Sequence, residues 1–155
     1  MIVTRLRDFL EQNGANYGHT THRPAFTARE VAVADHLSTR EVAKTIVFLG
    51  DGAYGMAVIP ASTYLDLKEL RELLGLSHLR LATEEELVGL FPDCELGAMP
   101  PFGNLYNMPV YVDGSLAREE TIAFNAGTHR DVAHMKFREF ERLAGAKVIS
   151  FSRAA

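Results

Sequence analysis

The sequence predicts an α+β fold in which a mixed, mostly antiparallel sheet curls around a pocket and is flanked by helices. Short runs rich in β-branched and aromatic residues, which are typical of strands, recur along the chain. These runs outnumber the segments in which apolar residues repeat at helical spacing. The two kinds of segment do not alternate strictly, as they would in a protein built from βαβ units. We expect residues 1–155 to form one domain.

The first third of the chain predicts two helices separated by a strand. Apolar residues at helical spacing predict a helix over residues 4–12, and residues 16–22 form a run typical of a short strand. Thr27 is a good N-cap, and Glu30 stands at the capping-box position three residues later. We therefore expect a helix that begins after Thr27 and runs to about Leu37.

The middle of the chain predicts a β-hairpin followed by two helices. Residues 41–49 form an apolar run that ends at a glycine-rich turn, and residues 54–60 are expected to pair back on it. Residues 66–75 predict a helix that ends on a glycine. A short strand over residues 79–82 precedes a helix over residues 83–90, which carries three glutamates in its first turn.

The last third of the chain predicts four strands and one helix. The strands are expected over residues 110–113, 121–127, 132–135 and 147–151, and the helix over residues 137–143. We find no linker, internal repeat or low-complexity segment in the sequence.

Composition and charge exclude several classes of protein. The chain carries 16 basic and 20 acidic residues, so its net charge of -4 produces no general field that would attract nucleic acid. Cys94 is the only cysteine, which excludes an internal disulfide. The N-terminal residues lack the apolar core of a signal peptide, and no apolar run is long enough to span a membrane. We expect a cytoplasmic protein with no membrane partner.

Lys44 is the first candidate functional residue, because it lies inside the apolar strand predicted over residues 41–49. Burying an ammonium group without partners has a free-energy cost on the order of several kcal/mol, or it forces a shift in the pKa of the group. Lys44 therefore either reaches solvent from an open face of the sheet or lines a polar pocket.

A second candidate is the loop over residues 97–103, which contains two glycines and two prolines. Prolines fix the backbone and glycines allow close approach, so the remaining amides of such a stiff loop can point at a ligand. The alternative is a connection that is stiffened by proline and has no binding role.

The third candidate is the end of the strand over residues 121–127, where Asn125, Gly127 and His129 place polar groups. They could form the rim of a pocket that binds a carbonyl or a phosphate. The alternative is an ordinary turn built around Asn and Gly.

Familiar catalytic and metal-binding motifs are missing from the sequence. The six histidines form no pair in a metal-binding frame, and we expect neither a metal nor another cofactor. Nothing near Cys94 marks an activating partner, and no serine stands in a nucleophile motif. Glycine-rich phosphate-binding motifs are also absent.

Several segments in a particular order resemble a known family, and they span nearly the whole chain from about residue 20 to residue 150. The segments are residues 43–48, 57–61, 65–68, 81–87, 97–103 and 124–127. In this order they resemble the YbaK family, the free-standing relatives of the editing domain found in bacterial prolyl-tRNA synthetases. The resemblance implies a hydrolase that removes a wrongly attached amino acid from the terminal adenosine of tRNA.

The resemblance also implies roles for individual residues. The family lysine, matched by Lys44, grips the backbone near the 3′ end, and amides of the loop that includes Gly97 and Pro101 hold the aminoacyl carbonyl. The attacking water is activated largely by a ribose hydroxyl of the substrate, without a metal. The further substrate contacts expected on this basis are Thr45, Ala98, Met99, Phe102, Gly103, Asn125, Gly127 and His129.

Departures from the family pattern leave the substrate open. Thr45 stands where some alanine-clearing members have asparagine, and Pro100-Pro101 stands where cysteine-clearing members tend to have Ser-Pro. The amino acid could be Ala, Cys or Ser, carried by tRNA-Pro or another tRNA. The expected partner is the acceptor end of aminoacyl-tRNA, and a synthetase partner stays open. Alternatives are a binding module without hydrolysis and a metal-dependent hydrolase.

Overall fold

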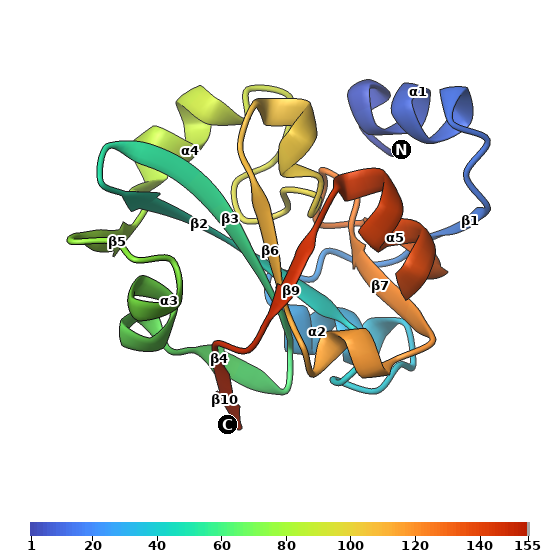
Figure 1. The fold of residues 1–155 in the computed structure, drawn as a ribbon. Helices are drawn as coiled ribbons and strands as arrows, with labels where there is room; N and C mark the ends of the chain where they lie inside the picture. The colour runs from blue at the N-terminus through green and yellow to red at the C-terminus, as the bar shows by residue number, and fades with distance from the viewer. Residues whose placement is uncertain (155) are drawn as a thin grey trace.

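The computed structural model describes residues 1–154, and a five-stranded sheet lies at its centre (Figure 1). The order of strands across this sheet is β5-β2-β3-β6-β9. Their bounds are β2 Ala43–Gly50, β3 Ala53–Pro60, β5 Leu79–Leu81, β6 Val110–Asp113 and β9 Lys147–Ile149. Strands β2 and β3 form the expected hairpin, in which Lys44 faces Ile59 across the pair.

Two smaller sheets complete the strand architecture. One has the order β1-β8-β7, with bounds Tyr17–Thr21, Asp131–Lys136 and Thr121–Asn125, and the other pairs β4 (Thr63–Leu65) with β10 (Ser152–Ala154). A parallel bridge between Val42 and Ala123 joins the three-stranded sheet to the start of β2. Among the paired strands of residues 1–154, only β3–β6 and β6–β9 are parallel, so the prediction of a mixed, mostly antiparallel α+β fold is confirmed. The strands are divided over three sheets, however, and none closes into a barrel.

Five α-helices and two short 3-10 turns flank the sheets (Figure 1). Their bounds are α1 Thr4–Gln12, α2 Ala28–Ala34, α3 Leu67–Leu73, α4 Glu84–Leu90, α5 Phe137–Ala144, η1 Gly103–Tyr106 and η2 Leu116–Arg118. Thr27, Asp66 and Thr83 cap α2, α3 and α4, and each side chain accepts a hydrogen bond from a backbone amide three residues later. The helix predicted to run to Leu37 instead ends at Ala34. None of the helices within residues 1–154 has both the length and the apolar character that crossing a bilayer requires.

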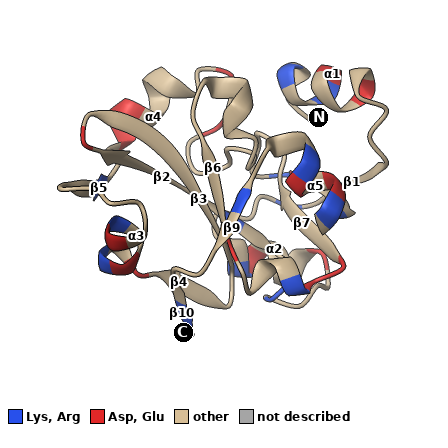
Figure 2. Ribbon diagram, in the orientation of Figure 1, with Lys and Arg blue, Asp and Glu red and all other residues tan. Residues whose placement is uncertain are grey.

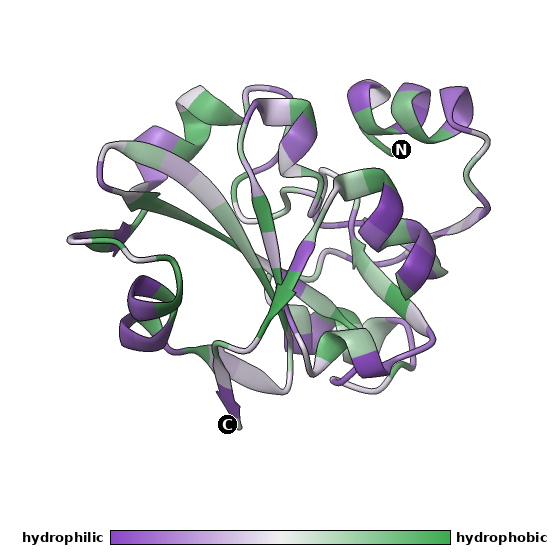
Figure 3. Ribbon diagram, viewed as in Figure 1, coloured by the Kyte–Doolittle hydropathy of each residue, from purple (hydrophilic) through white to green (hydrophobic). Residues whose placement is uncertain are grey.

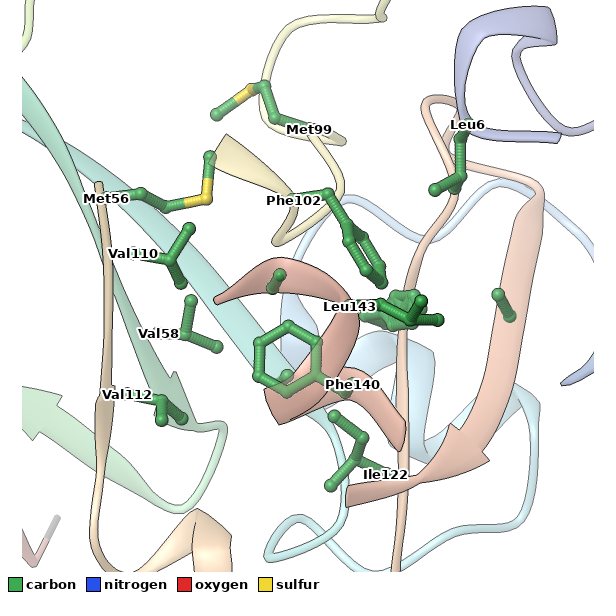
Figure 4. Packing of buried hydrophobic residues seen from close by; sticks show 14 of the residues in the cluster. Leu6, Met56, Val58, Met99, Phe102, Val110, Val112, Ile122, Phe140 and Leu143 are labelled. Carbon is green, nitrogen blue, oxygen red and sulfur yellow. The ribbon is translucent and has the colours of Figure 1, made fainter. Parts of the chain in front are cut away.

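The largest part of the core lies between the central sheet, the β1-β8-β7 sheet, α1 and α5. Figure 3 shows apolar residues concentrated on the central strands, while α3 and α5 turn hydrophilic faces outward. Charged residues lie mainly outside the central strands. Strand β3 carries none, and most of the charged residues visible in Figure 2 lie on helices and turns. In the interior, the ring of Phe102 packs against the rings of Phe124 and Phe140, with 5.5 Å between centroids in each pair. Figure 4 shows Phe102 and Phe140 in this packing.

The pairing of β4 with β10 is a feature that the sequence pattern did not reveal. Both strands have only three residues, too few for a recognisable alternation of apolar and polar side chains. Asp113 holds this region in place, because its buried carboxylate accepts hydrogen bonds from the amides of Phe151 and Ser152 at 2.7 and 2.9 Å. The pairing matters for the site, since β4 supplies the carbonyl that binds Lys44.

Candidate active site

A cavity of about 390 Å³ lies where β2, the start of α2, the loop after α4 and the end of β7 meet. Lys44 and Gly97, which are distant in sequence, both line it. The full lining is Phe26, Thr27, Ala28, Arg29, Lys44, Thr45, Ile46, Ala61, Gly97 and Asn125. The strand lysine and the glycine–proline loop, two of the three candidates from the sequence, therefore share one cavity, and Asn125 adds the third.

Lys44 presents a half-buried ammonium group to this cavity. Its Nζ donates a hydrogen bond to the carbonyl oxygen of Thr63 on β4 at 3.0 Å, which fixes the direction of the side chain. Burial lowers the pKa of Lys44 from its ordinary value, and the nearby positive charge of Arg29 lowers this pKa further. An anion bound beside Lys44 would relieve both effects.

The electrostatics of the lining favour an anionic ligand. Lys44 and Arg29 contribute two positive charges, and none of the other lining residues is acidic. The chain as a whole has a net charge of -4, so this positive character is local. A ligand with phosphate or carboxylate groups suits such a site better than a cation does.

The loop at Gly97 is fixed to the end of β7 by two backbone hydrogen bonds. The amide of Gly127 donates to the carbonyl of Ala98 at 3.0 Å, and the amide of Glu95 donates to the carbonyl of Gly127 at 2.8 Å. Gly97 itself has a φ of +86°, in the left-handed region that favours glycine. The positive φ of Gly97 and the hydrogen bonds of Glu95 and Ala98 to Gly127 together place the exposed Gly97 at the cavity.

His129 supports this loop rather than presenting a free imidazole to the cavity. Its backbone amide donates to Oε1 of Glu95 at 2.7 Å, and its ring Nε2 lies 2.7 Å from the carbonyl oxygen of Leu96. A carbonyl only accepts, so Nε2 carries the proton and donates. The ring also packs against Phe26, with centroids 4.7 Å apart.

Asn125 supplies an acceptor that is not used inside the protein. It is the last residue of β7, and its Oδ1 is buried without a hydrogen-bond partner among residues 1–154. A buried polar atom without a partner is costly, so a donor on a bound ligand would stabilise this site.

The remaining loop residues that were expected to act at the site do not line the cavity. Ala98, Met99, Pro101, Phe102 and Gly103 are buried, and none of them is part of the cavity lining. Figure 4 shows Phe102 pointing from the loop into the core, and Met99 borders a separate cavity of about 60 Å³ under α4. These residues are the buried part of the loop, and Met99 and Phe102 anchor it in the hydrophobic core.

Gly127 also lies outside the lining, although it is bound to the loop. A Cβ at this position would come within 2.2 Å of Val3, and the φ of Gly127 is +97°. The absence of a side chain therefore lets the start of the chain pack against the end of β7. Gly127 positions the loop through its two backbone hydrogen bonds.

Sequence reasoning missed the contribution of α2 to the lining. Phe26 and Arg29 flank the cap residue Thr27, and the sequence pattern here predicts only the start of a helix. Arg29 could have indicated this contribution. A basic residue in the first turn of a helix interacts unfavourably with the helix dipole, so a role other than helix stabilisation is expected for it. Ile46 and Ala61 also line the cavity, but nothing in the sequence distinguishes them from ordinary core residues.

Cys94 and the histidines lie outside the cavity. Burial raises the pKa of the Cys94 thiol to about 11, which keeps it protonated near neutral pH. Within residues 1–154, no three His, Cys, Asp or Glu side chains come close enough together to hold a metal ion.

Comparison with known proteins identifies the family. The sequence profile of the aminoacyl-tRNA editing domain matches residues 22–143. The chain belongs to this family. The resemblance to YbaK-like editing proteins is thereby confirmed, and so is the expectation that the protein is a hydrolase of the deacylase type.

Individual relatives support the same assignment over the length of the chain. The multifunctional Ser/Thr-tRNA deacylase ProXp-y of Escherichia coli K12 is 29% identical over 156 aligned residues, which cover 97% of this chain and 93% of the relative. The uncharacterized protein YwhH of Bacillus subtilis is 26% identical over 123 residues, covering 79% of this chain and 77% of the relative.

Solved structures confirm the fold of this editing-domain family member. A crystal structure described as a candidate trans-editing enzyme for prolyl tRNA synthetase superposes with a TM-score of 0.86 at 27% identity, covering 98% of this chain and 97% of that one. The hypothetical protein APE2540 superposes with a TM-score of 0.87 at 25% identity, covering 96% and 99% of the two chains.

Proposed function

We propose that this member of the editing-domain family hydrolyses the ester that joins a small, wrongly attached amino acid to the 3′ end of tRNA, acting in trans. The observation that supports this most directly is that Lys44, Gly97 and Asn125 line one cavity. A cation, a loop backbone and an amide side chain meet there, and an aminoacylated 3′ end offers a phosphate, a carbonyl and hydrogen-bond donors. The proposal places the protein in the cytoplasm, where charged tRNA is used.

The proposed mechanism depends on positioning and charge stabilisation. Lys44 binds a phosphate near the 3′ end, as a point charge suited to this group. The aminoacyl carbonyl lies against the loop, where the amide of Gly97 stabilises the oxyanion that forms when water attacks. One such donor contributes about 3–4 kcal/mol to lowering a barrier of this kind. The bond from the carbonyl carbon to the ribose oxygen then breaks, and this oxygen takes up the proton that the attacking water gives up.

The substrate itself assists in this proposal. The free ribose hydroxyl next to the ester orients the attacking water, so no protein base and no metal is required. This fits a lining whose only ionisable side chains are Lys44 and Arg29. An ester is already an activated carbonyl, and correct orientation of the water lowers the barrier further.

We propose serine and threonine as the amino acids removed. The unpaired Oδ1 of Asn125 can accept a hydrogen bond from their side-chain hydroxyl, and Thr45 adds a second polar group to the same cavity. A site that binds a hydroxyl group discriminates against an analogue that lacks it, because its own polar atom is then left unpaired. The likeness to a Ser/Thr-tRNA deacylase supports the same choice.

A panel of mischarged tRNAs tests this function. Ser-, Thr-, Ala- and Cys-charged tRNA, including tRNA-Pro, are incubated with the protein, with and without a chelator, and the remaining ester is measured over time. We expect rapid loss of Ser and Thr esters, slower loss of Ala, and no effect of the chelator. Protection of every ester would indicate a binding module instead, and loss of activity with chelator would indicate a metal-dependent hydrolase.

A further inference from the structure

Phe26 is an exposed aromatic residue at the cavity that the hydrolytic mechanism does not use. Its side chain is 65% exposed, although it lines the cavity beside Thr27 and Arg29. It belongs to none of the three hydrophobic clusters of the core. Packing of the fold therefore does not explain a phenylalanine at this position.

The ring of Phe26 is nevertheless held in place. It packs on the ring of His129 at 4.7 Å between centroids, and His129 is bound to Leu96 and Glu95 of the loop. The backbone amide of Phe26 donates to Oε2 of Glu30 at 3.3 Å. One side of the ring is thus supported by the protein, while most of its surface stays open to solvent.

Two cations share the cavity with this ring. Arg29 lies three residues after Phe26 on α2, and Lys44 faces the same space from β2. The nearest acidic group on this helix, Glu30, is hydrogen-bonded to the amide of Phe26. A flat apolar surface next to positive charges is the arrangement that binds single-stranded nucleic acid, because bases stack on the ring and phosphates pair with the cations.

We propose that Phe26 is the platform on which the terminal adenine of the tRNA acceptor end stacks, and that Arg29 pairs with the phosphate preceding it. This inference rests on the function proposed above. It specifies where the terminal base and the preceding phosphate of the substrate bind. Stacking of the base beside the loop places the ribose next to Gly97 and Lys44. Phe26 and Arg29 are then substrate-binding residues, and their contribution is made before the chemical step.

Binding of short RNA tests the inference without any hydrolysis. A labelled single-stranded RNA that ends in ACCA is titrated with the protein, and fluorescence anisotropy gives Kd. We expect Phe26→Ala to weaken binding at least about tenfold, the size of losing one stacked base. Phe26→Trp is expected to retain binding, because it keeps an aromatic surface. Arg29→Ala is expected to weaken binding and to reduce its dependence on salt.

Matched controls separate stacking from general surface effects. Val88 on α4 is similarly exposed at 61%, and Arg138 on α5 is an exposed arginine away from the cavity, so Val88→Ala and Arg138→Ala should change Kd less than twofold. An RNA that ends in ACC lacks the terminal base. Removing this base should weaken binding to the wild-type protein but have little further effect on Phe26→Ala.

Kinetics distinguish failure of this inference from failure of the proposed function. On Ser-charged tRNA we expect Phe26→Ala to raise KM about tenfold and to leave kcat within twofold of wild type. Wild-type protein that binds ACCA through Phe26 but hydrolyses no ester would overturn the function and support the platform. Unchanged Kd and KM in Phe26→Ala, with an active wild-type enzyme, would overturn the platform alone. Phe26 is exposed, so circular dichroism should show an unchanged melting temperature in this variant.

Discussion

At the scale of single residues, Lys44 is held in an environment that disfavours its charge. The side chain is half-buried and close to Arg29, and both effects lower its pKa. One backbone carbonyl, from Thr63, accepts a hydrogen bond from its ammonium. Such a residue contributes little to folding, because one hydrogen bond offsets only part of the desolvation cost. A role in binding an anionic substrate explains its position better than a role in stability.

Replacement of this lysine therefore provides a residue-scale prediction. We expect Lys44→Met to reduce deacylation of Ser-charged tRNA at least about a hundredfold, since one group that stabilises bound substrate and transition state is lost. The free energy of unfolding should stay within about 1 kcal/mol of wild type, because the ammonium is replaced by an apolar group of similar length. Single-turnover kinetics and urea unfolding measure the two quantities. Lys44→Arg, which keeps the charge, serves as control, and an active Lys44→Met would rule out the proposed role.

At the scale of elements, the loop and the end of β7 hold one another through backbone groups. Gly127 bonds to Ala98 and Glu95, while His129 bonds to Leu96 and Glu95. The loop is therefore anchored immediately before and after Gly97. Gly97 is free to face the cavity, and its φ of +86° is the only unusual backbone feature that the loop requires there.

A β-branched residue at Gly97 is predicted to damage catalysis more than folding. A Cβ there would meet His129 only at an ordinary distance of 3.5 Å, so strain comes from the positive φ and displaces the loop. We expect Gly97→Val to reduce turnover at least about tenfold.

Gly52 offers a matched control for this variant, with a φ of +85° and open space around it in the β2–β3 turn. Gly52→Val carries the same backbone strain but should leave turnover unchanged. Equal activity of Gly97→Val and wild type would show that the loop is only structural. Thermal melting of both variants measures the loss of stability that a β-branched residue at a positive φ causes in each.

At the scale of the whole molecule, the site depends on the closing strand of the chain. Lys44 binds the carbonyl of Thr63 on β4, and β4 pairs with β10. Asp113 at the end of β6 binds the amides of Phe151 and Ser152, which precede and begin β10. One buried carboxylate thus connects the central sheet to the strand pair that orients the lysine.

This arrangement predicts a loss of stability in acid. Burial alone would raise the pKa of Asp113, but hydrogen bonds from Ser115 and the amide of Phe151 outweigh it and lower this pKa from its ordinary value. A folded-state pKa below the unfolded value means that the carboxylate stabilises the fold at neutral pH. This contribution is lost as the pH falls below about 4 toward the folded-state pKa.

Asp113→Asn tests the source of this acid sensitivity. Urea unfolding at neutral pH should show a loss of about 2 kcal/mol, typical of hydrogen bonds to a charged group. The variant should also lose less stability than wild type between about pH 5 and pH 3, because the titrating group is gone. An identical acid response in the two proteins would contradict the role of Asp113.

The regular elements and one part of the site could be predicted from local sequence patterns. Thr27, Asp66 and Thr83 act as the caps that their residue types indicate, and the β2–β3 hairpin forms as its glycine-rich turn indicates. Lys44 on β2 is identifiable from the sequence, because a charge inside an apolar strand is costly to bury and so indicates a polar site. These features are local, since each is determined by neighbours within a few residues.

What the sequence by itself determined is therefore the class of fold, the family and the candidate lysine and loop. Tertiary structure alone decided which residues of the loop reach the cavity, since Gly97 faces it whereas Phe102 is packed in the core. It also decided that Phe26 and Arg29 join the site, and that the short strands β4 and β10 pair. The physical reason is that burial and pairing depend on contacts between distant segments, which leave no periodic signal in any one of them.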